Sequence, residues 1–332
     1  MKRFASILVL AAMSLSLTAG IHSYVDESVL STGHWVKIRV KETGVCRMTF
    51  DELHKAGLNP QQLRVYGYGG VMLAQDFTKK KIDDLPQVPV YMGEDYVLFY
   101  VRGNIGWSYN GARFVHTRNT YSDYGYYLLS DDTGEMLAPT EGEAISGTPT
   151  EVSFYTNYQV HEEDLLNLVD RTGISGGGRE FYGEQFNGGQ TQSFVFKTPN
   201  AREGEQTIAY VTTAGYSSTT STFQINANGQ ISTTRIEAVV NDHYTMAKTG
   251  STSMRVPAQA NEQKMELTYQ NHTSGALGWL NYIEWMVPCD LKMSGDWMGI
   301  RTNINYLSNT PVRFHLSGAD TNTQIWDVTN PQ

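Results

Sequence analysis

The stretch "STFQINANGQISTTRIEAV", residues 221–239, decides the fold class of this chain. Before Asn228-Gly229, Phe223, Ile225 and Ala227 alternate with polar residues, and a period of two is typical of a β-strand with one buried face. An Asn-Gly pair readily adopts the positive φ angles that a two-residue hairpin turn requires. The stretch therefore predicts a β-hairpin with its tip at Asn228-Gly229.

Short segments of the same kind recur along most of the chain. "WVKIRV" (residues 35–40) alternates apolar and basic residues, so we expect a half-buried strand with one wet face. "DYVLFYVRG" (95–103) is almost wholly apolar and predicts a central strand. Further candidate strands are "LRVYGYGG" (63–70), "GARFVHT" (111–117), "YGYYLLS" (124–130), "VSFYTNYQV" (152–160), "QSFVFKT" (192–198), "QTIAYVTTAG" (206–215), "KMELTYQN" (264–271) and "LNYIEWMVP" (280–288).

Only two segments predict helices, and both are short. Thr49 followed by Glu52 forms a capping box, and Gly57 ends the helix that it opens. "HEEDLLNLV" (161–169) is the second candidate helix. About a dozen strands against two short helices predict a mainly β protein, and their spacing is typical of sandwiches or barrels rather than βαβ units.

A segment rich in Gly, Pro, Thr and Glu, "EMLAPTEGEAISGTPT" (135–150), suggests a boundary between two β-rich modules. We expect a small module of β or α+β type over residues 21–145. A β-sandwich or jelly-roll-like module is expected over residues 150–325. Residues 326–332, which include an Asn-Pro pair, resemble a linker.

The N-terminus predicts export. Lys2-Arg3 precedes the apolar stretch "FASILVLAAMSLSL" (4–17), which is short for a membrane span, and small residues follow at 18–20. Residues 1–20 therefore read as a signal peptide, and without a following cysteine a lipid anchor is not expected. We expect the mature chain in the periplasm or at the outer membrane or cell surface, with no transmembrane segment.

Charge and cysteine content narrow the function classes. A net charge of -9 argues against a nucleic-acid partner, because phosphate binding needs clustered Lys and Arg. Export permits a disulfide between the two cysteines, Cys46 and Cys289, but two buried free thiols fit the sequence equally well. The sequence leaves both alternatives open.

No motif for catalysis, cofactor or metal is apparent. Neither cysteine lies in a loop that would present a thiolate to a histidine base, so we predict no catalytic residue. His161 lacks a second histidine at helical zinc spacing, and "GISGGGRE" (173–180) lacks the Lys-Ser/Thr of a phosphate-binding loop, so neither a metal nor a cofactor is expected. Four aromatic residues are candidates for sugar binding, but the aromatic-rich composition favours core or interface packing for them: Trp107, Tyr109, Trp279 and Trp297.

One segment stands out as a candidate interaction loop. "GISGGGREFYGEQF" (173–186) combines glycines, which allow adaptation, with adjacent charged and aromatic side chains of the kind common at interfaces. An alternative is that Arg179 and Glu184 simply pair across a turn. The predicted interaction residues are Gly176, Gly177, Gly178, Arg179, Glu180, Phe181, Tyr182 and Glu184.

The order of several segments carries a family resemblance. The segments are "SVLSTGHWVKIRVKETGVCRMTFDEL" (28–53), "LRVYGYGG" (63–70), "GREFYGEQF" (178–186), "GALGWLNYIEW" (275–285) and "IWDVTNP" (325–331). Together they resemble the N-terminal region of the PorU family. These proteins are sortase-like cysteine peptidases of the type IX secretion system and are related to gingipains.

The resemblance implies a role in cargo attachment. In the family this β-rich region precedes a caspase-like α/β catalytic domain, which removes C-terminal signal domains from secreted cargo and attaches the cargo to the cell surface. It also implies partners, namely that catalytic domain, a PorV-like outer-membrane protein and other attachment-complex proteins. The family's catalytic Cys and His have no counterparts in these 332 residues, so we expect a truncated, inactive accessory region.

Two other functions remain compatible with the residues alone. One is a stand-alone secreted β-sandwich that binds carbohydrate or protein, or that mediates adhesion. The other is a hydrolase that uses Cys289 with a distant histidine.

Overall fold

A computed structural model describes residues 24–76, 78–79, 82–132, 134–143, 146–168, 180–240, 246–302 and 311–330. The chain divides into two compact units. The first comprises residues 1–103, 124–139 and 329–332, and the second comprises 104–123 and 140–328. Residues 104–123, which the sequence analysis placed in the first module, thus belong to the second.

The first unit contains two antiparallel sheets. One has the order β1-β9-β3-β4 and the other has the order β2-β6-β5. Their strands are β1 (Val36–Val40), β2 (Gly44–Thr49), β3 (Arg64–Tyr66), β4 (Gln87–Val88), β5 (Val90–Met92), β6 (Tyr96–Val101) and β9 (Gly125–Ser130). Leu53, Val65, Phe99 and Leu129 contribute to one buried apolar cluster, to which both sheets and the helix add side chains.

The helix of the first unit confirms its predicted start and end. Helix α2 (Phe50–Lys55) begins after Thr49, whose hydroxyl accepts from the Glu52 amide while the Glu52 carboxylate accepts from the Thr49 amide. Gly57 follows with φ of +79°, a conformation that glycine adopts without steric penalty. Two 3₁₀ turns, η2 (Val29–Ser31) and η3 (Pro60–Gln62), complete this unit's described helical elements.

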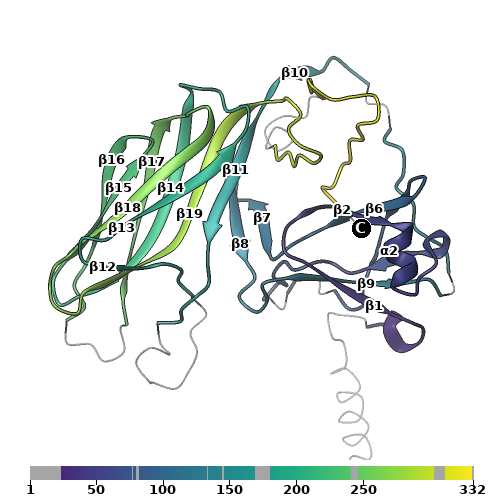
Figure 1. Ribbon diagram of the computed structural model, residues 1–332, viewed down its shortest axis with the longest axis horizontal. Coiled ribbons are helices and arrows are strands. Elements are labelled where there is room, and N and C mark those ends of the chain that lie inside the picture. The colour runs from purple at the N-terminus through teal and green to yellow at the C-terminus, as the bar shows by residue number, and fades with distance from the viewer. Residues whose placement is uncertain are drawn as a thin grey trace, which may run out of the picture. The chain divides into compact units, whose positions relative to one another are not determined.

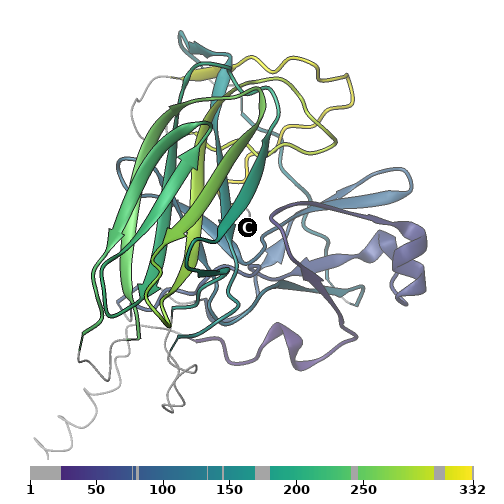
Figure 2. The same cartoon turned by 60° about the vertical axis from the view of Figure 1, so that its left-hand side comes forward.

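The second unit is a β-sandwich, seen in green in Figures 1 and 2. One sheet has the order β11-β19-β14-β17, with β12 also paired to β19, and the other has the order β13-β18-β15-β16. Their strands are β11 (Phe154–Glu162), β12 (Gln185–Asn187), β13 (Thr191–Thr198), β14 (Gln206–Tyr216), β15 (Ser221–Ala227), β16 (Gln230–Ile236), β17 (Lys248–Pro257), β18 (Asn261–Gln270) and β19 (Leu277–Asp290). Inward side chains of both sheets form one core, in which the rings of Phe196 and Trp285 lie 6.1 Å apart.

The β-hairpin predicted at Asn228-Gly229 is confirmed. Strands β15 and β16 pair through Ala227↔Gln230, and the two turn residues, Asn228 and Gly229, have φ of 49° and 88°. Both angles are positive, as a type I′ hairpin turn requires. The mainly β architecture expected from alternation is likewise what the structure shows.

Two short pairs of strands complete the second unit. Strands β7 (Ile105–Tyr109) and β8 (Phe114–Arg118) form an antiparallel hairpin. Strands β10 (Thr150–Val152) and β20 (Val312–Phe314) run parallel. Within the described residues, no helix is long and apolar enough to cross a membrane.

The predicted helix over residues 161–169 is wrong. His161 and Glu162 end strand β11 and pair with Ile283 and Tyr282 of β19, and residues 163–165 have no regular structure. Pairing with the long strand β19 overrides the helical preference of the local sequence. Val169 lies outside the described residues.

Candidate functional site

A buried ionic network lies beneath the β7–β8 hairpin of the second unit. The hairpin packs on the face of the β11-β19-β14-β17 sheet that points away from the sandwich core (Figure 1). Aromatic contacts hold it there, with the Tyr158 ring 5.7 Å from Trp107 and 5.2 Å from Phe114. A polar network then forms between the hairpin and the sheet.

Glu284 is the centre of this network. It lies in the middle of β19 and is 2% exposed. Its carboxylate accepts from the Arg113 guanidinium and lies 2.5 Å from His116 Nδ1. The other ring nitrogen of His116, Nε2, lies 3.1 Å from the Glu162 carboxylate, so the imidazole bridges two acids from neighbouring strands. A neutral imidazole cannot donate from both nitrogens, whereas an imidazolium can.

The charges of these groups follow from their surroundings. Burial opposes a charge on His116, but its hydrogen bonds to Glu162 and Glu284 outweigh that effect and raise its pKa to about 9. Burial likewise opposes a charge on Glu284, but the hydrogen bond to His116 and the Arg113 guanidinium hold its pKa below the ordinary value. At neutral pH the network therefore contains an imidazolium and a carboxylate, both buried.

A second layer surrounds this centre. Arg118 donates to Asp164 at 3.0 Å, to Asp123 at 2.9 Å and to the Glu162 carbonyl at 3.0 Å. The Arg113 guanidinium lies 3.9 Å from the centroid of the Tyr210 ring, a cation–π contact. Each buried charge thus has a partner, which is the condition under which burying ions is tolerated.

This arrangement acts as a clamp. The side chains of His116 and Glu284 are only 6% and 3% exposed, so a substrate has no approach to them. Breaking the ion pairs would leave uncompensated charges in a desolvated site. Because that is energetically costly, the ion pairs fix the hairpin in one position. We refer to Arg113, His116, Arg118, Glu162, Asp164 and Glu284 as the hairpin clamp.

The predicted interaction loop is described only in part. Gly176, Gly177, Gly178 and Arg179 lie outside the described residues. Glu180, Phe181, Tyr182 and Glu184 are described. The backbone of Tyr182 pairs with Leu166, and Gly183 donates to the carbonyl of Leu280 in β19.

The described part of the loop is anchored to the sheet. Tyr182 is 4% exposed and joins Leu168, Ala214 and Trp279 in a small apolar cluster. Glu180 accepts from Asn281 Nδ2 at 3.0 Å, and Glu184 lies 2.7 Å from His161 Nε2. Burial and the neighbouring Glu180 raise the pKa of Tyr182 well above its usual range. Whether Arg179 pairs with Glu184 lies outside the described residues, and the described partner of Glu184 is His161.

The aromatic residues considered for sugar binding divide into two groups. Trp279 is fully buried, and Trp107 packs against His116 of the hairpin and Tyr158 of β11. Tyr109 packs on Phe114 with ring centroids 5.5 Å apart. Trp297 is 42% exposed. Three of the four therefore stabilise the fold, which favours the packing interpretation.

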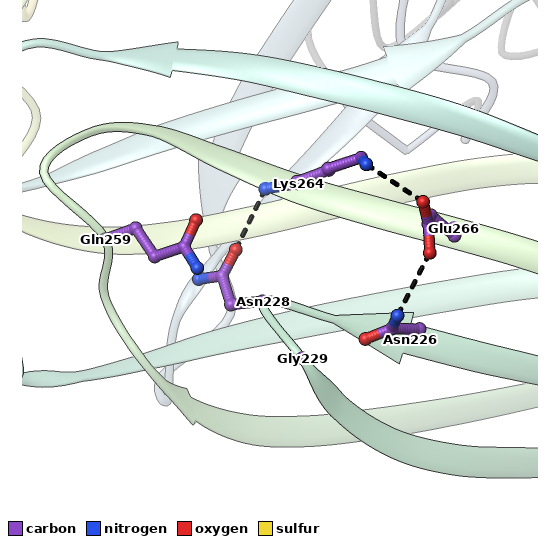
Figure 3. A pocket seen from close by; sticks show the side chains of 6 residues that line it. All are labelled: Asn226, Asn228, Gly229, Gln259, Lys264 and Glu266. Carbon is purple, nitrogen blue, oxygen red and sulfur yellow. Dashed lines mark hydrogen bonds and ion pairs between the residues drawn. The ribbon is translucent and has the colours of Figure 1, made fainter.

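A small polar hollow of about 220 Å³ lies beside the tip of the β15–β16 hairpin (Figure 3). It is lined by Asn226, Asn228, Gly229, Gln259, Lys264 and Glu266. Asn228 accepts from the Lys264 amide at 2.9 Å, and Glu266 pairs with both Asn226 and the Lys264 ammonium. These groups largely satisfy one another's hydrogen-bonding capacity, so their main role is to hold the hairpin tip in place.

Both cysteines are free thiols. Cys46 lies in β2 of the first unit and Cys289 in β19 of the second, so the disulfide alternative is not found. Burial raises the pKa of Cys289 to about 12 despite a hydrogen bond with Asn157. Burial, followed by the nearby Glu52 carboxylate, raises the pKa of Cys46. Neither thiol is presented as a nucleophile, because the thiolate is the reactive form.

We expect Cys289 to resist modification in the folded chain. At pH 8, a pKa of about 12 lowers the thiolate fraction by about a thousandfold relative to an ordinary cysteine. The Cys46→Ala variant isolates Cys289, and its reaction with a chromogenic aryl disulfide should become rapid only after denaturation. Rapid stoichiometric labelling of the folded variant would contradict the buried position.

The hairpin clamp was not predicted from the sequence. Its members lie on three segments whose positions differ by up to 171 residues, and nothing in the sequence brings them together. The one available signal was Glu284 itself, a single acid within the mostly apolar strand "LNYIEWMVP". A carboxylate at such a position requires a buried cation as partner.

The fold and the clamp define a β-rich region of two units, in which the sandwich holds a hairpin by buried ion pairs. No family model and no curated protein matches the sequence. Among solved structures, the chain is similar to the dimeric latent PorU from Porphyromonas gingivalis, with a TM-score of 0.75 and 29% identity. The match covers 88% of this chain and 27% of that one, so the chain resembles the N-terminal region of PorU.

Other solved structures match weakly. The insecticidal δ-endotoxin Cry8Ea1 from Bacillus thuringiensis has a TM-score of 0.27 and 10% identity, and the match covers 68% of this chain and 42% of the toxin. A CBM35 module from Cellvibrio japonicus has a TM-score of 0.23 and 10% identity, covering 45% of this chain and 91% of the module. These similarities are too low to support any functional argument.

Proposed function

We propose that this chain serves as the N-terminal, non-catalytic region of a PorU-like sortase of the type IX secretion system. In this proposal it is exported by residues 1–20 and works at the outer membrane or cell surface. Removal of C-terminal signal domains and attachment of cargo belong to a separate α/β catalytic domain. The chain supplies a rigid scaffold that positions that domain and docks a PorV-like outer-membrane protein and other attachment-complex proteins.

The observation that carries the proposal is the similarity to PorU over 88% of the chain at a TM-score of 0.75. A similarity of this extent includes both units. The hairpin clamp supports a scaffold role, because buried ion pairs fix the hairpin in a single position, and rigid scaffolds are what loops and partners need for precise placement. The burial of Cys289 and its raised pKa fit a structural rather than a nucleophilic thiol.

A domain exchange in Porphyromonas gingivalis tests the proposal. The matching region of its PorU is replaced by residues 24–328 of this chain behind the native PorU signal sequence. We expect the exchanged protein to remove C-terminal signals from cargo and to cross-link to PorV. A parallel strain carries the same exchange with Glu284→Gln, and it should lose both functions because the hairpin is no longer held.

The outcomes of the exchange are distinct. An exchanged protein that accumulates at the surface and resists protease, yet leaves cargo unprocessed and fails to cross-link to PorV, would overturn the proposal. Processing without the PorV cross-link would retain the PorU-like role but remove the PorV docking function from this region.

A further inference from the structure

Strand β1 of the first unit has one unpaired edge. It pairs with β9 along its whole length, from Val36↔Leu129 to Val40↔Gly125, and it is the terminal strand of the β1-β9-β3-β4 sheet. Among the described residues, no strand pairs with its other side. Alternate backbone N–H and C=O groups of β1 therefore point away from the sheet, where they offer a template for a further strand.

The outer face of β1 is basic. Lys37 and Arg39 are exposed and point to the same side of the sheet. The Lys37 ammonium lies 4.0 Å from the centroid of the Tyr126 ring, and the Arg39 guanidinium carbon lies 4.8 Å from that of Tyr124. These cation–π contacts hold both cations above the sheet and leave their N–H groups able to donate. A basic surface of this kind on a chain of net charge -9 favours an acidic partner.

The opposite face of β1 is apolar and incompletely covered. Val36, Ile38 and Val40 pack against the core of the first unit but are only half-buried. Their neighbours on the same face of β9, Tyr127 and Leu129, are 2% and 0% exposed. The difference arises because β1 has a neighbouring strand on one side only, and a further strand with apolar residues on this face would complete the cover.

We propose that the free edge of β1 binds an extended segment of a partner protein in which acidic and apolar residues alternate. The segment adds to the sheet as a strand, with its acidic side chains opposite Lys37 and Arg39. Its apolar side chains lie beside Val36, Ile38 and Val40. Backbone hydrogen bonds supply affinity and the alternating side chains supply specificity, as in other cases of strand addition.

Alternative occupants fit the surface less well. A polyanionic glycan or lipid headgroup would satisfy the two cations but neither the repeating backbone groups nor the apolar face. A second copy paired through β1 would bring basic side chains opposite basic side chains, which is destabilising. Basic residues on an edge strand also discourage such self-pairing, and this property is compatible with an acidic partner.

The inference deepens the proposed scaffold function by naming the chemistry of one partner, and it rests on that function only in taking the partner to be a protein. The geometry of β1 carries it independently. Peptide binding to the isolated chain is measured without any sortase activity, so failure here leaves the PorU-like role intact. Failure of the domain exchange would in turn leave this binding site standing.

The probe is a fluorescein-labelled octapeptide of alternating Glu and Val, added to the full chain and followed by fluorescence anisotropy. We expect saturable binding that the Lys37→Glu/Arg39→Glu variant weakens by about tenfold or more, because two exposed attractions become repulsions. The matched control is Lys197→Glu/Arg255→Glu, which changes the same charge at exposed positions on β13 and β17. It should bind like the unaltered chain, and thermal melts should show that both variants are folded.

Two further probes separate strand addition from simple charge attraction. The same peptide with alternate amides N-methylated keeps its charge but loses backbone donors, so its binding should fall severalfold or more. The proposal would be overturned if the methylated peptide bound as tightly as the unmethylated one. It would also be overturned if the control variant lost as much affinity as Lys37→Glu/Arg39→Glu, or if no saturable binding were seen. Dextran sulfate that binds through Lys37 and Arg39 more tightly than the peptide would assign the surface to a polyanionic glycan instead.

Discussion

Replacing Glu284 with Gln is expected to lower the free energy of unfolding of the second unit by about 3–5 kcal/mol. The substitution keeps the size of the side chain and removes its charge. Arg113 and His116, which both contact this carboxylate, then remain as cations in a buried site with one acid fewer. Urea denaturation followed by tryptophan fluorescence measures the change, since Trp107 lies within the affected hairpin.

A matched control separates burial from charge alone. Glu237 also pairs with an arginine, Arg235, but both side chains are more than two-thirds exposed, at 68% and 69%. Glu237→Gln should change stability by less than about 0.5 kcal/mol, because exposed ion pairs contribute little. Similar losses in the two variants would show that Glu284 is not the centre of a buried network.

Proteolysis gives a second readout for the same substitution. Trypsin cleaves after arginine, and Arg113 and Arg118 are both members of the hairpin clamp. We expect cleavage at these residues to become faster in Glu284→Gln, because loss of the central acid releases the hairpin locally before the sandwich unfolds. Unchanged cleavage at both arginines, together with a large loss of stability, would place the effect in the sandwich rather than in the hairpin.

Alternation in the sequence predicted most strands because it is a local property. In "FQINANGQIS" each apolar residue before the turn faces the core, and Asn228-Gly229 accepts the positive φ angles of the turn. The capping box of helix α2 is equally local, since Thr49 and Glu52 bond to each other's backbone. Such features need no knowledge of the distant chain, so sequence reasoning finds them.

The features that sequence reasoning missed depend on contacts between distant segments. Residues 161–169 resemble a helix, but His161 and Glu162 belong to strand β11 because they pair with Ile283 and Tyr282 of β19, which are distant in the sequence. Two of the three acids of this segment, Glu162 and Asp164, bond to His116 and Arg118 of the hairpin. Periodicity shows which face of a strand is buried but not which buried side chains meet.

The placement of residues 104–123 in the second unit was missed for the same reason, because it too depends on contacts between distant segments. The composition of this segment does not differ from that of its neighbours, and the boundary near residue 140 was the only one with a clear Gly- and Pro-rich signal. What places the hairpin with the sandwich is the set of contacts from Trp107, Arg113 and His116 to the outer face of the sheet. Because His116 titrates, these contacts also make the stability of the hairpin clamp depend on pH.

Stability is expected to fall as the pH rises from about 6.5 to about 9. The pKa of His116 rises from an ordinary value of 6.5 to about 9 in the folded chain, so folding favours the protonated form. The resulting stabilisation is complete below pH 6.5, declines as the pH approaches 9 and is absent above it. A shift of this size corresponds to about 3 kcal/mol at most. Glu284, whose pKa is held below its ordinary value by His116 and Arg113, stays ionised throughout this window.

Urea unfolding at a series of pH values, in the unaltered chain and in His116→Gln, measures this dependence. The variant should lose the slope between pH 6.5 and 9, while His315→Gln should retain it, because His315 pairs with Glu151 at a site where both side chains are about half exposed. If His116→Gln is too unstable to measure, calorimetry in buffers of different ionisation enthalpy should detect the release of about one proton on unfolding of the unaltered chain near pH 7.8. A flat stability profile without proton release would mean that His116 is neutral in the fold, and a neutral imidazole bonds to only one of its two acids as a donor.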